Sequence, residues 1–117
     1  IGRVIYPGLA SHPHHTLAAS LFGSRGYGGM VAFELAGAQR DDVFRFFDSL
    51  QLCVPATSLG DIETLLLYPA HSSHRALSAT ERYELGISDS LVRMSVGIEA
   101  AEDLIDDLSQ ALRRFGE

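Results

Sequence analysis

Residues 28–35 read Gly-Gly-Met-Val-Ala-Phe-Glu-Leu, and after the two glycines this stretch predicts a strand over residues 30–35. Val31, Phe33 and Leu35 fall on one face of that strand, because side chains in a strand alternate with a period of two. Residues 91–96 (LVRMSV) show the same alternation. The two stretches predict neighbouring strands of a sheet with one apolar face.

Working outward from these two strands, the chain alternates short strands and helices without any repeat. We expect further strands over residues 3–6, 52–56 and 64–68, and helices over residues 13–22, 41–50, 79–85 and 100–115. The loops after the third and fourth strands are too short for helical crossovers. The order therefore predicts the α+β class, with a largely antiparallel sheet, helices packed on one face, and the other face free to cover a second domain.

Three helix ends and faces follow from local patterns. Ser11 is the expected N-cap of the first helix, with Pro13 near its first position. Residues 78–81 (SATE) form a capping-box pattern. On the last helix, the inward-facing residues are expected to be Leu104, Ile105, Leu108 and Leu112.

Composition excludes several classes of function. The chain has 117 residues, enough for one domain, and a formal net charge of −6, which argues against a broad nucleic-acid surface. No apolar run is long enough to span a bilayer. Cys53 is the single cysteine, so an internal disulfide and a multi-cysteine zinc site are excluded.

All nine basic side chains are arginine, so this chain cannot form a Schiff base through a lysine. A genome whose codons favour arginine is the simplest reason for this composition. The sequence begins at Ile1 without a methionine and without a signal-like segment. We therefore expect a piece of a longer, cytoplasmic protein.

Arg93 is the residue most suggestive of a binding site. It lies in mid-strand between apolar residues, on the face opposite the apolar stripe. A planar guanidinium on a rigid strand suits bidentate binding of a carboxylate. An exposed or salt-bridged arginine on an open sheet face explains the same pattern, so spacing alone leaves both interpretations open.

Other reactive residues carry weaker signals. His71 and His74 have the spacing of a metal-ligand pair on a helix, but no third ligand is near and the segment favours a loop. The glycine-rich residues 23–29 precede a strand and not a helix, which favours a tight connection over phosphate binding. Cys53 is expected to be a core residue, and Ser58 has no neighbouring base that would make it a nucleophile.

Several motifs of the chain resemble motifs that occur in the same order in a family of Cys/Met-metabolism enzymes that use pyridoxal phosphate (PLP). This family includes cystathionine γ-synthase, cystathionine lyase and methionine γ-lyase. Residues 6–13 (YPGLASHP) and 28–35 (GGMVAFEL) are similar to two family segments. Residues 91–99 (LVRMSVGIE) are similar to a third. Shorter matches are SLG at 58–60, ETL at 63–65, YPA at 68–70, SH at 73–74 and LGI at 85–87.

The resemblance implies that residues 1–117 are the small C-terminal substrate-binding domain of a fold-type-I PLP enzyme. It implies that Arg93 and Ser58 bind the α-carboxylate of a sulfur-containing amino acid, and that Leu59 adds main-chain contacts. Holding that carboxylate orients the Cα–H bond relative to the PLP ring. The resemblance also implies that the lysine that binds PLP lies in a large domain missing from this chain, so that this chain alone is inactive. The whole protein is expected to be a cytoplasmic homotetramer without nucleic-acid or membrane partners.

Two departures from the family pattern leave the subfamily open. Asp61 replaces a common glycine, and it either adds a carboxylate near the substrate entrance or caps a turn. His71 and the residues up to His74 also differ from the common form, so β-elimination, γ-elimination and γ-replacement all remain open. The competing hypothesis is a non-catalytic docking or assembly module, which a full-length sequence without an upstream lysine segment would favour.

Overall fold

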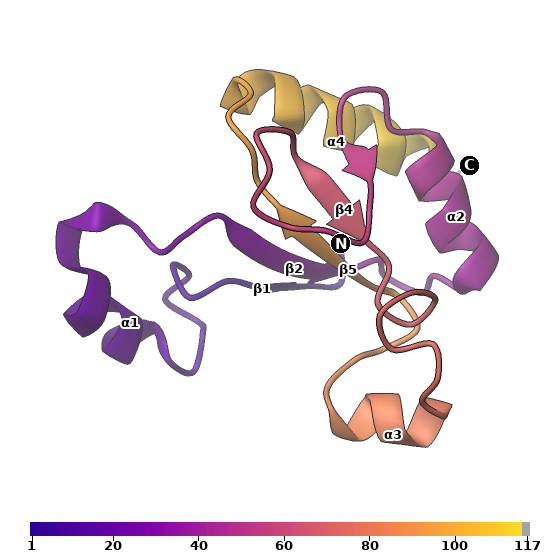
Figure 1. Cartoon of the computed structure of the whole chain (residues 1–117), viewed down its shortest axis with the longest axis horizontal. Coiled ribbons are helices and arrows are strands. Elements are labelled where there is room, and N and C mark those ends of the chain that lie inside the picture. The colour runs from indigo at the N-terminus through magenta and orange to yellow at the C-terminus, as the bar shows by residue number, and fades with distance from the viewer. Residues whose placement is uncertain (116–117) are drawn as a thin grey trace.

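A computed structural model describes residues 1–115, and its centre is a five-stranded sheet in the order β1-β2-β5-β4-β3 (Figure 1). The strands are β1 (Arg3–Ile5), β2 (Met30–Glu34), β3 (Val54–Pro55), β4 (Leu65–Leu67) and β5 (Leu91–Ser95). β1, β2, β5 and β4 pair antiparallel, whereas β3 joins β4 in parallel. The predicted α+β class with a mostly antiparallel sheet is confirmed.

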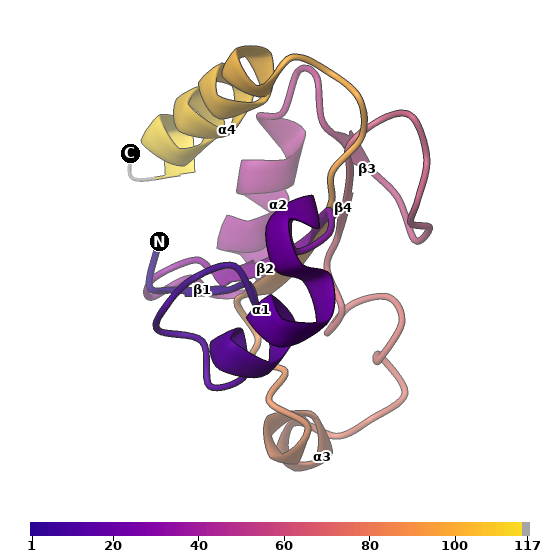
Figure 2. The same cartoon turned by 90° about the vertical axis from the view of Figure 1, so that its left-hand side faces the viewer.

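Three α-helices and a short 3-10 turn lie between the strands in residues 1–115, and a fourth helix follows β5. They are α1 (His15–Phe22), the 3-10 turn Gly23–Arg25, α2 (Arg40–Asp48), α3 (Ala79–Glu84) and α4 (Ala101–Phe115). α2 and α4 cover one face of the sheet, while α1 and α3 stand apart from it (Figures 1 and 2). The capping box before α3 is confirmed, because Ser78 Oγ accepts from the Glu81 N–H and Glu81 binds the Ser78 N–H.

The hydrophobic core lies between the sheet and the two helices α2 and α4. Val43 and Phe46 of α2 are fully buried, and they belong to one apolar cluster with Leu66 of β4 and Val92 of β5. The buried residues of α2 are spaced three and four positions apart, and side chains at this spacing share one face of a helix. The core therefore fixes β5 in the middle of the sheet.

Asp107 of α4 is a buried carboxylate that the sequence pattern did not reveal. Its oxygens accept from the backbone N–H groups of Gln51, Leu52 and Cys53, at 2.8, 3.0 and 2.8 Å. These N–H groups are therefore not available to a strand. The strand predicted over residues 52–56 is for this reason wrong in length, and β3 is restricted to Val54–Pro55.

On α4, the expected inward position of Ile105 is wrong, because this side chain is 61% exposed. Asp107 and Ala111 are buried instead, together with the correctly predicted Leu104. Leu108 and Leu112 are partly buried against the core, as expected. The buried stripe of α4 therefore includes a carboxylate, which hydrophobic periodicity alone does not select.

The start of α1 also differs from the prediction. The helix begins at His15, after turns in which His12 N–H bonds to Leu9 O and His15 N–H bonds to His12 O. These turns occupy the residues where Ser11 was expected to cap the helix. The residue at the N-cap is His14, without a side-chain cap.

The second face of the sheet is covered over β4 and the end of β5, whereas Met30, on the same face of β2, is 39% exposed, so the expectation of a free face holds only in part. Leu65, Leu67 and Ser95 lie on this face by their register, and each is no more than 5% exposed. The loop of residues 57–63 crosses the face and donates a backbone hydrogen bond to Ser95. This loop carries two of the predicted substrate-binding residues.

Candidate functional site

Arg93 lies at the centre of β5, which is itself the central strand of the sheet. Its register partners are Ala32 on β2 and Leu67 on β4. Its neighbours on the same face of β5 are Leu91 and Ser95. The guanidinium therefore rises from a rigid strand surrounded by small, apolar or uncharged side chains.

The loop of residues 57–63 brings Ser58 and Leu59 to Arg93. Arg93 Nη2 donates to the Ser58 carbonyl oxygen at 3.0 Å, and the Gly60 N–H donates to Ser95 Oγ at 2.8 Å. Gly60 has φ of +75°, a left-handed conformation that glycine adopts without strain. The structure thus places the Ser58 backbone against Arg93, with Leu59 as the next residue of the loop.

The positive charge of Arg93 has no acidic partner among residues 1–115, because no Asp or Glu oxygen lies within 4.0 Å of it. Its Nε is buried and makes no hydrogen bond. An ionised side chain in partly apolar surroundings is stabilised by a charge-assisted hydrogen bond to an anion. The arrangement is therefore suited to holding a carboxylate.

A set of contacts around Thr64, here called the Thr64 clasp, holds the end of the 57–63 loop. Glu99 accepts from Thr64 N–H at 2.6 Å and from Thr64 Oγ1 at 2.8 Å. Gly97 N–H donates to Thr64 Oγ1 at 2.9 Å, and Ile98 N–H donates to Ile62 O at 2.9 Å. The clasp joins the chain after β5 to the chain before β4.

The clasp also sets the ionisation of Glu99. Burial raises the pKa of this carboxyl. The hydrogen bonds that it accepts, chiefly from Thr64, lower the pKa by more than burial raises it, so the pKa lies below the usual value. Sequence reasoning assigned no role to Glu99, Thr64 or Ser95. The signal that could have pointed to them is the carboxylate shortly after the strand that carries Arg93.

The remaining candidates take structural positions. Cys53 is 4% exposed, and burial, followed by the adjacent Asp107, raises the pKa of its thiol to about 12. It is a core residue, as predicted. Asp61 Oδ1 accepts from the N–H of the next residue, Ile62, at 2.7 Å, a contact within the loop of residues 57–63. Ser58 makes no side-chain hydrogen bond to a base in the part of the chain described here.

His71 and His74 lie in turns, as the sequence indicated. His74 Nδ1 is 2.8 Å from Ser73 Oγ, and His71 stacks on Tyr68. Within residues 1–115, no three or more His, Cys, Asp or Glu side chains are grouped in a way that could hold a metal ion. Residues 23–29 form a tight connection with left-handed glycines at 23, 26 and 28.

The known proteins that resemble this chain in sequence and those that resemble it in structure belong to the same group of enzymes. A family profile described as "Cys/Met metabolism PLP-dependent enzyme" matches residues 1–113. The chain is 46% identical over 112 residues to a cystathionine gamma-lyase of Dictyostelium discoideum, covering 96% of this chain and 28% of that protein. It is 48% identical over 111 residues to an L-methionine gamma-lyase of Pseudomonas putida, covering 92% and 26%.

Among solved structures, cystathionine gamma synthase from Xanthomonas oryzae pv. oryzae in complex with cystathionine superposes with a TM-score of 0.87 at 45% identity. The match covers 98% of this chain and 29% of that one. The chain therefore spans less than a third of the length of these relatives. None of the helices in residues 1–115 is both long and apolar enough to cross a membrane.

Proposed function

Because this chain belongs to the Cys/Met metabolism PLP-dependent enzyme family, we propose that it is the C-terminal substrate-binding domain of a longer sulfur-amino-acid enzyme. In this proposal Arg93 binds the α-carboxylate of the amino-acid substrate. The observation that carries it is the guanidinium on β5, which has no ion pair within the described residues and lies against the Ser58 carbonyl.

Arg93 is suited to this role by rigidity as well as by charge. It projects from the central strand of the sheet, so its position varies little and less entropy is lost on binding. The hydrogen bond to Ser58 O uses one Nη2 donor and leaves other guanidinium donors for a ligand. A carboxylate held there fixes the orientation of the attached Cα.

Ser58 and Leu59 would complete the carboxylate site. Ser58 is exposed and its hydroxyl is free to donate to a carboxylate oxygen, while the backbone of the loop supplies N–H groups. Ser95 Oγ and the Thr64 clasp hold this loop against the Arg93 face. They act as positioning residues, because they touch the loop and not the ligand.

The chain itself does not offer a covalent attachment for PLP, because its sequence contains no lysine. The family's cofactor supplies an electron sink next to the substrate Cα. In the proposed protein its lysine lies in a large domain outside residues 1–117, and this chain contributes binding and orientation of the substrate only. The reaction class is C–S bond cleavage or γ-replacement, in a cytoplasmic homotetramer.

The test uses the longer protein that the proposal implies. Its bound cofactor is followed by absorbance while cysteine, methionine and cystathionine are added in turn. One substrate should shift the cofactor band. Arg93→Ala should then raise the concentration needed for half of the shift about tenfold to a hundredfold, the range expected for loss of a charged hydrogen bond.

Two control variants sharpen this test. Arg93→Lys retains the charge but loses the planar fork, so it should restore part of the affinity. Arg114→Ala removes an exposed charge on α4 and should leave the titration unchanged. A longer protein with no cofactor band after addition of PLP, or Arg93→Ala with unchanged titration, would overturn the proposal and favour a docking module.

A further inference from the structure

A second cationic region lies outside the Arg93 site. It is a cleft of about 610 Å³ beside the turns that follow β4, and its lining includes Arg40, Tyr68, His71, Arg75, Arg82 and Asp89. Arg93, Ser58 and Leu59 are not among the residues that line this cleft. Three of the nine basic residues of an acidic chain therefore line one cleft.

Arg82 is the fixed cation of this cleft. Its Nη2 donates to Asp89 Oδ1 at 2.7 Å, and its Nη1 donates to Leu77 O at 2.8 Å. Only 13% of its side chain is exposed, and its Nε is buried without a hydrogen-bond partner. A buried guanidinium N–H without an acceptor costs free energy. The Arg82 guanidinium therefore still has one hydrogen-bond donor without a partner.

Arg40 and Arg75 add two exposed cations to the lining. Neither has an acidic partner within 4.0 Å among the described residues. The Arg40 guanidinium lies 5.5 Å from the centre of the Phe44 ring, an interaction that restricts its position. Asp89 is the one carboxylate in the lining, and its Oδ1 is already bound by Arg82.

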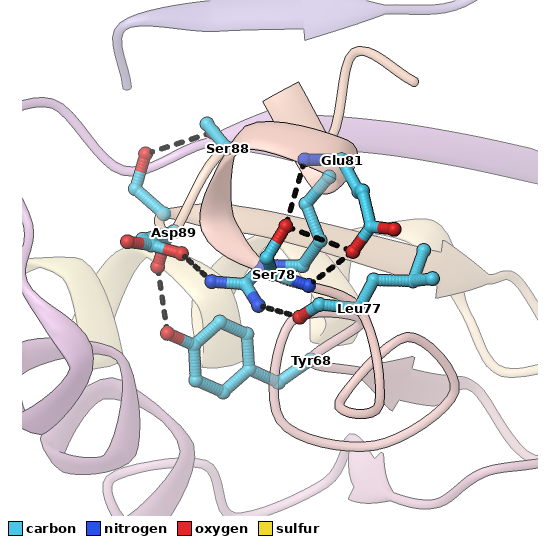
Figure 3. A network of polar contacts seen from close by, with 8 residues as sticks. Tyr68, Leu77, Ser78, Glu81, Ser88 and Asp89 are labelled. Atoms are coloured by element: carbon cyan, nitrogen blue, oxygen red, sulfur yellow. Dashed lines mark hydrogen bonds and ion pairs between the residues drawn. The ribbon is translucent and has the colours of Figure 1, made fainter. Parts of the chain in front are cut away.

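Two ring side chains, Tyr68 and His71, line one side of the cleft, and Phe44 packs against His71 from outside the lining. His71 stacks on Tyr68 with ring centres 6.2 Å apart, and Phe44 meets His71 edge-on at 4.8 Å. The Tyr68 hydroxyl donates to the Asp89 carbonyl oxygen at 2.7 Å, which ties the wall to the Arg82 network (Figure 3). The cations are therefore arranged around a supported surface.

We propose that this cleft binds a small dianion, a phosphate group or a dicarboxylate, through Arg40 and Arg75 beside the Arg82–Asp89 pair. Two guanidinium groups can each offer paired N–H donors to oxyanions. A compact dianion matches a cleft with one carboxylate, which would repel an extended polyanion. This site is independent of the function proposed for Arg93 and can be tested without any cofactor.

The experiment titrates the isotope-labelled chain with inorganic phosphate and, separately, malonate, and follows backbone amide signals by NMR. Sodium chloride at equal ionic strength is the reference. Saturable shifts are expected at residues 70–76 and at Asp89 with at least one dianion. Preference for phosphate indicates a phosphate-bearing ligand, and preference for malonate indicates a dicarboxylate.

Variants decide whether the binding belongs to the cleft. Arg40→Ala and Arg75→Ala should each weaken it about tenfold, the loss expected for one charged hydrogen bond. Both residues are exposed, so dispersed amide signals should show that both variants fold. Arg114→Ala, an exposed arginine outside the cleft, should change the affinity less than about twofold. Shifts no larger than those with chloride, or unchanged affinity in both cleft variants, would overturn the proposal.

Discussion

Asp107 and Glu99 are carboxylates in two different regions of the molecule, and both accept hydrogen bonds from distant backbone. Asp107 lies among the helices and binds three consecutive N–H groups of residues 51–53, together with Gln110. Glu99 lies in the segment between β5 and α4, and its carboxylate accepts from the backbone N–H and the hydroxyl of Thr64. The first contact joins α4 to the segment before β3, and the second holds the loop of the candidate site.

The difference between the two regions lies in burial and in the number of bonds. Asp107 is 5% exposed, whereas Glu99 is partly exposed. Burial raises the pKa of Asp107, but the hydrogen bonds from Cys53, Gln51, Leu52 and Gln110 lower it to a net value below its usual range. Asp107 should therefore support the whole fold, and Glu99 mainly the site loop, which makes the two regions separable by mutation.

The largest effect should come from Asp107→Ala. The change leaves three backbone N–H groups without their acceptor in a buried region, so we expect a loss of about 3 kcal/mol in the free energy of unfolding. Urea unfolding of the chain measures this loss. Asp106→Ala, at the exposed neighbouring position on α4, should change the free energy by less than about 0.5 kcal/mol. Equal effects of the two variants would remove the distinction drawn for Asp107.

Gly97→Ala should have the next largest effect, through the clasp. A Cβ at this position would overlap the Ile62 carbonyl oxygen and lie 2.6 Å from Glu99 Oε2. Overpacking of this kind costs about 2 kcal/mol. Gly2→Ala is the matched control, because a Cβ there meets its neighbours at 3.5 Å, an ordinary contact. If urea midpoints of the two variants agree, the clasp is looser than its contacts imply.

The same two regions explain what the sequence could predict. The alternation of residues 91–96 placed Arg93 in mid-strand, and the Ser78–Glu81 pattern predicted the capping box, because both signals are local. The bond from Asp107 to Cys53 spans 54 residues and that from Glu99 to Thr64 spans 35. Periodicity cannot assign such partners, so the length of β3 and the clasp were both missed.

Ser58 and Leu59 were assigned to the same site as Arg93 because of the family resemblance, and not because of their spacing in the sequence. Nothing in residues 57–63 alone indicates that they cross the sheet, because the bonds of this loop go to β5. The exposure of Ile105 has a similar cause. A polar residue, Asp107, occupies the buried stripe that a hydrophobic pattern assigns to apolar residues.

A smaller and pH-dependent effect is expected for Glu99→Gln. The amide has a single carbonyl oxygen, so it can still accept from the Thr64 N–H but not also from Thr64 Oγ1, and it loses the charge, which should cost about 1 kcal/mol at pH 7. Because the pKa of Glu99 is lowered in the folded state, its contribution is fully present above the unfolded pKa of about 4.3 and is lost as the pH falls through the folded value. Urea unfolding at pH 7 and pH 3 should therefore show a difference between parent and variant that shrinks in acid. A difference that is equal at both pH values would mean that the charge of Glu99 is not involved.

Ser95→Ala should have the smallest effect and the most local one. It removes the oxygen that accepts from the Gly60 N–H but retains the Cβ, so the 3%-exposed position stays filled. Loss of one neutral hydrogen bond, about 1 kcal/mol, should speed hydrogen exchange of the Gly60 amide about fivefold while the urea midpoint hardly moves. Ser20→Ala, on α1, removes a hydroxyl that bonds within its own helix and should leave Gly60 unchanged. If Ser95→Ala lowered global stability as much as Asp107→Ala, the loop and the helices would form one cooperative unit, and the candidate site could not be loosened without unfolding the domain.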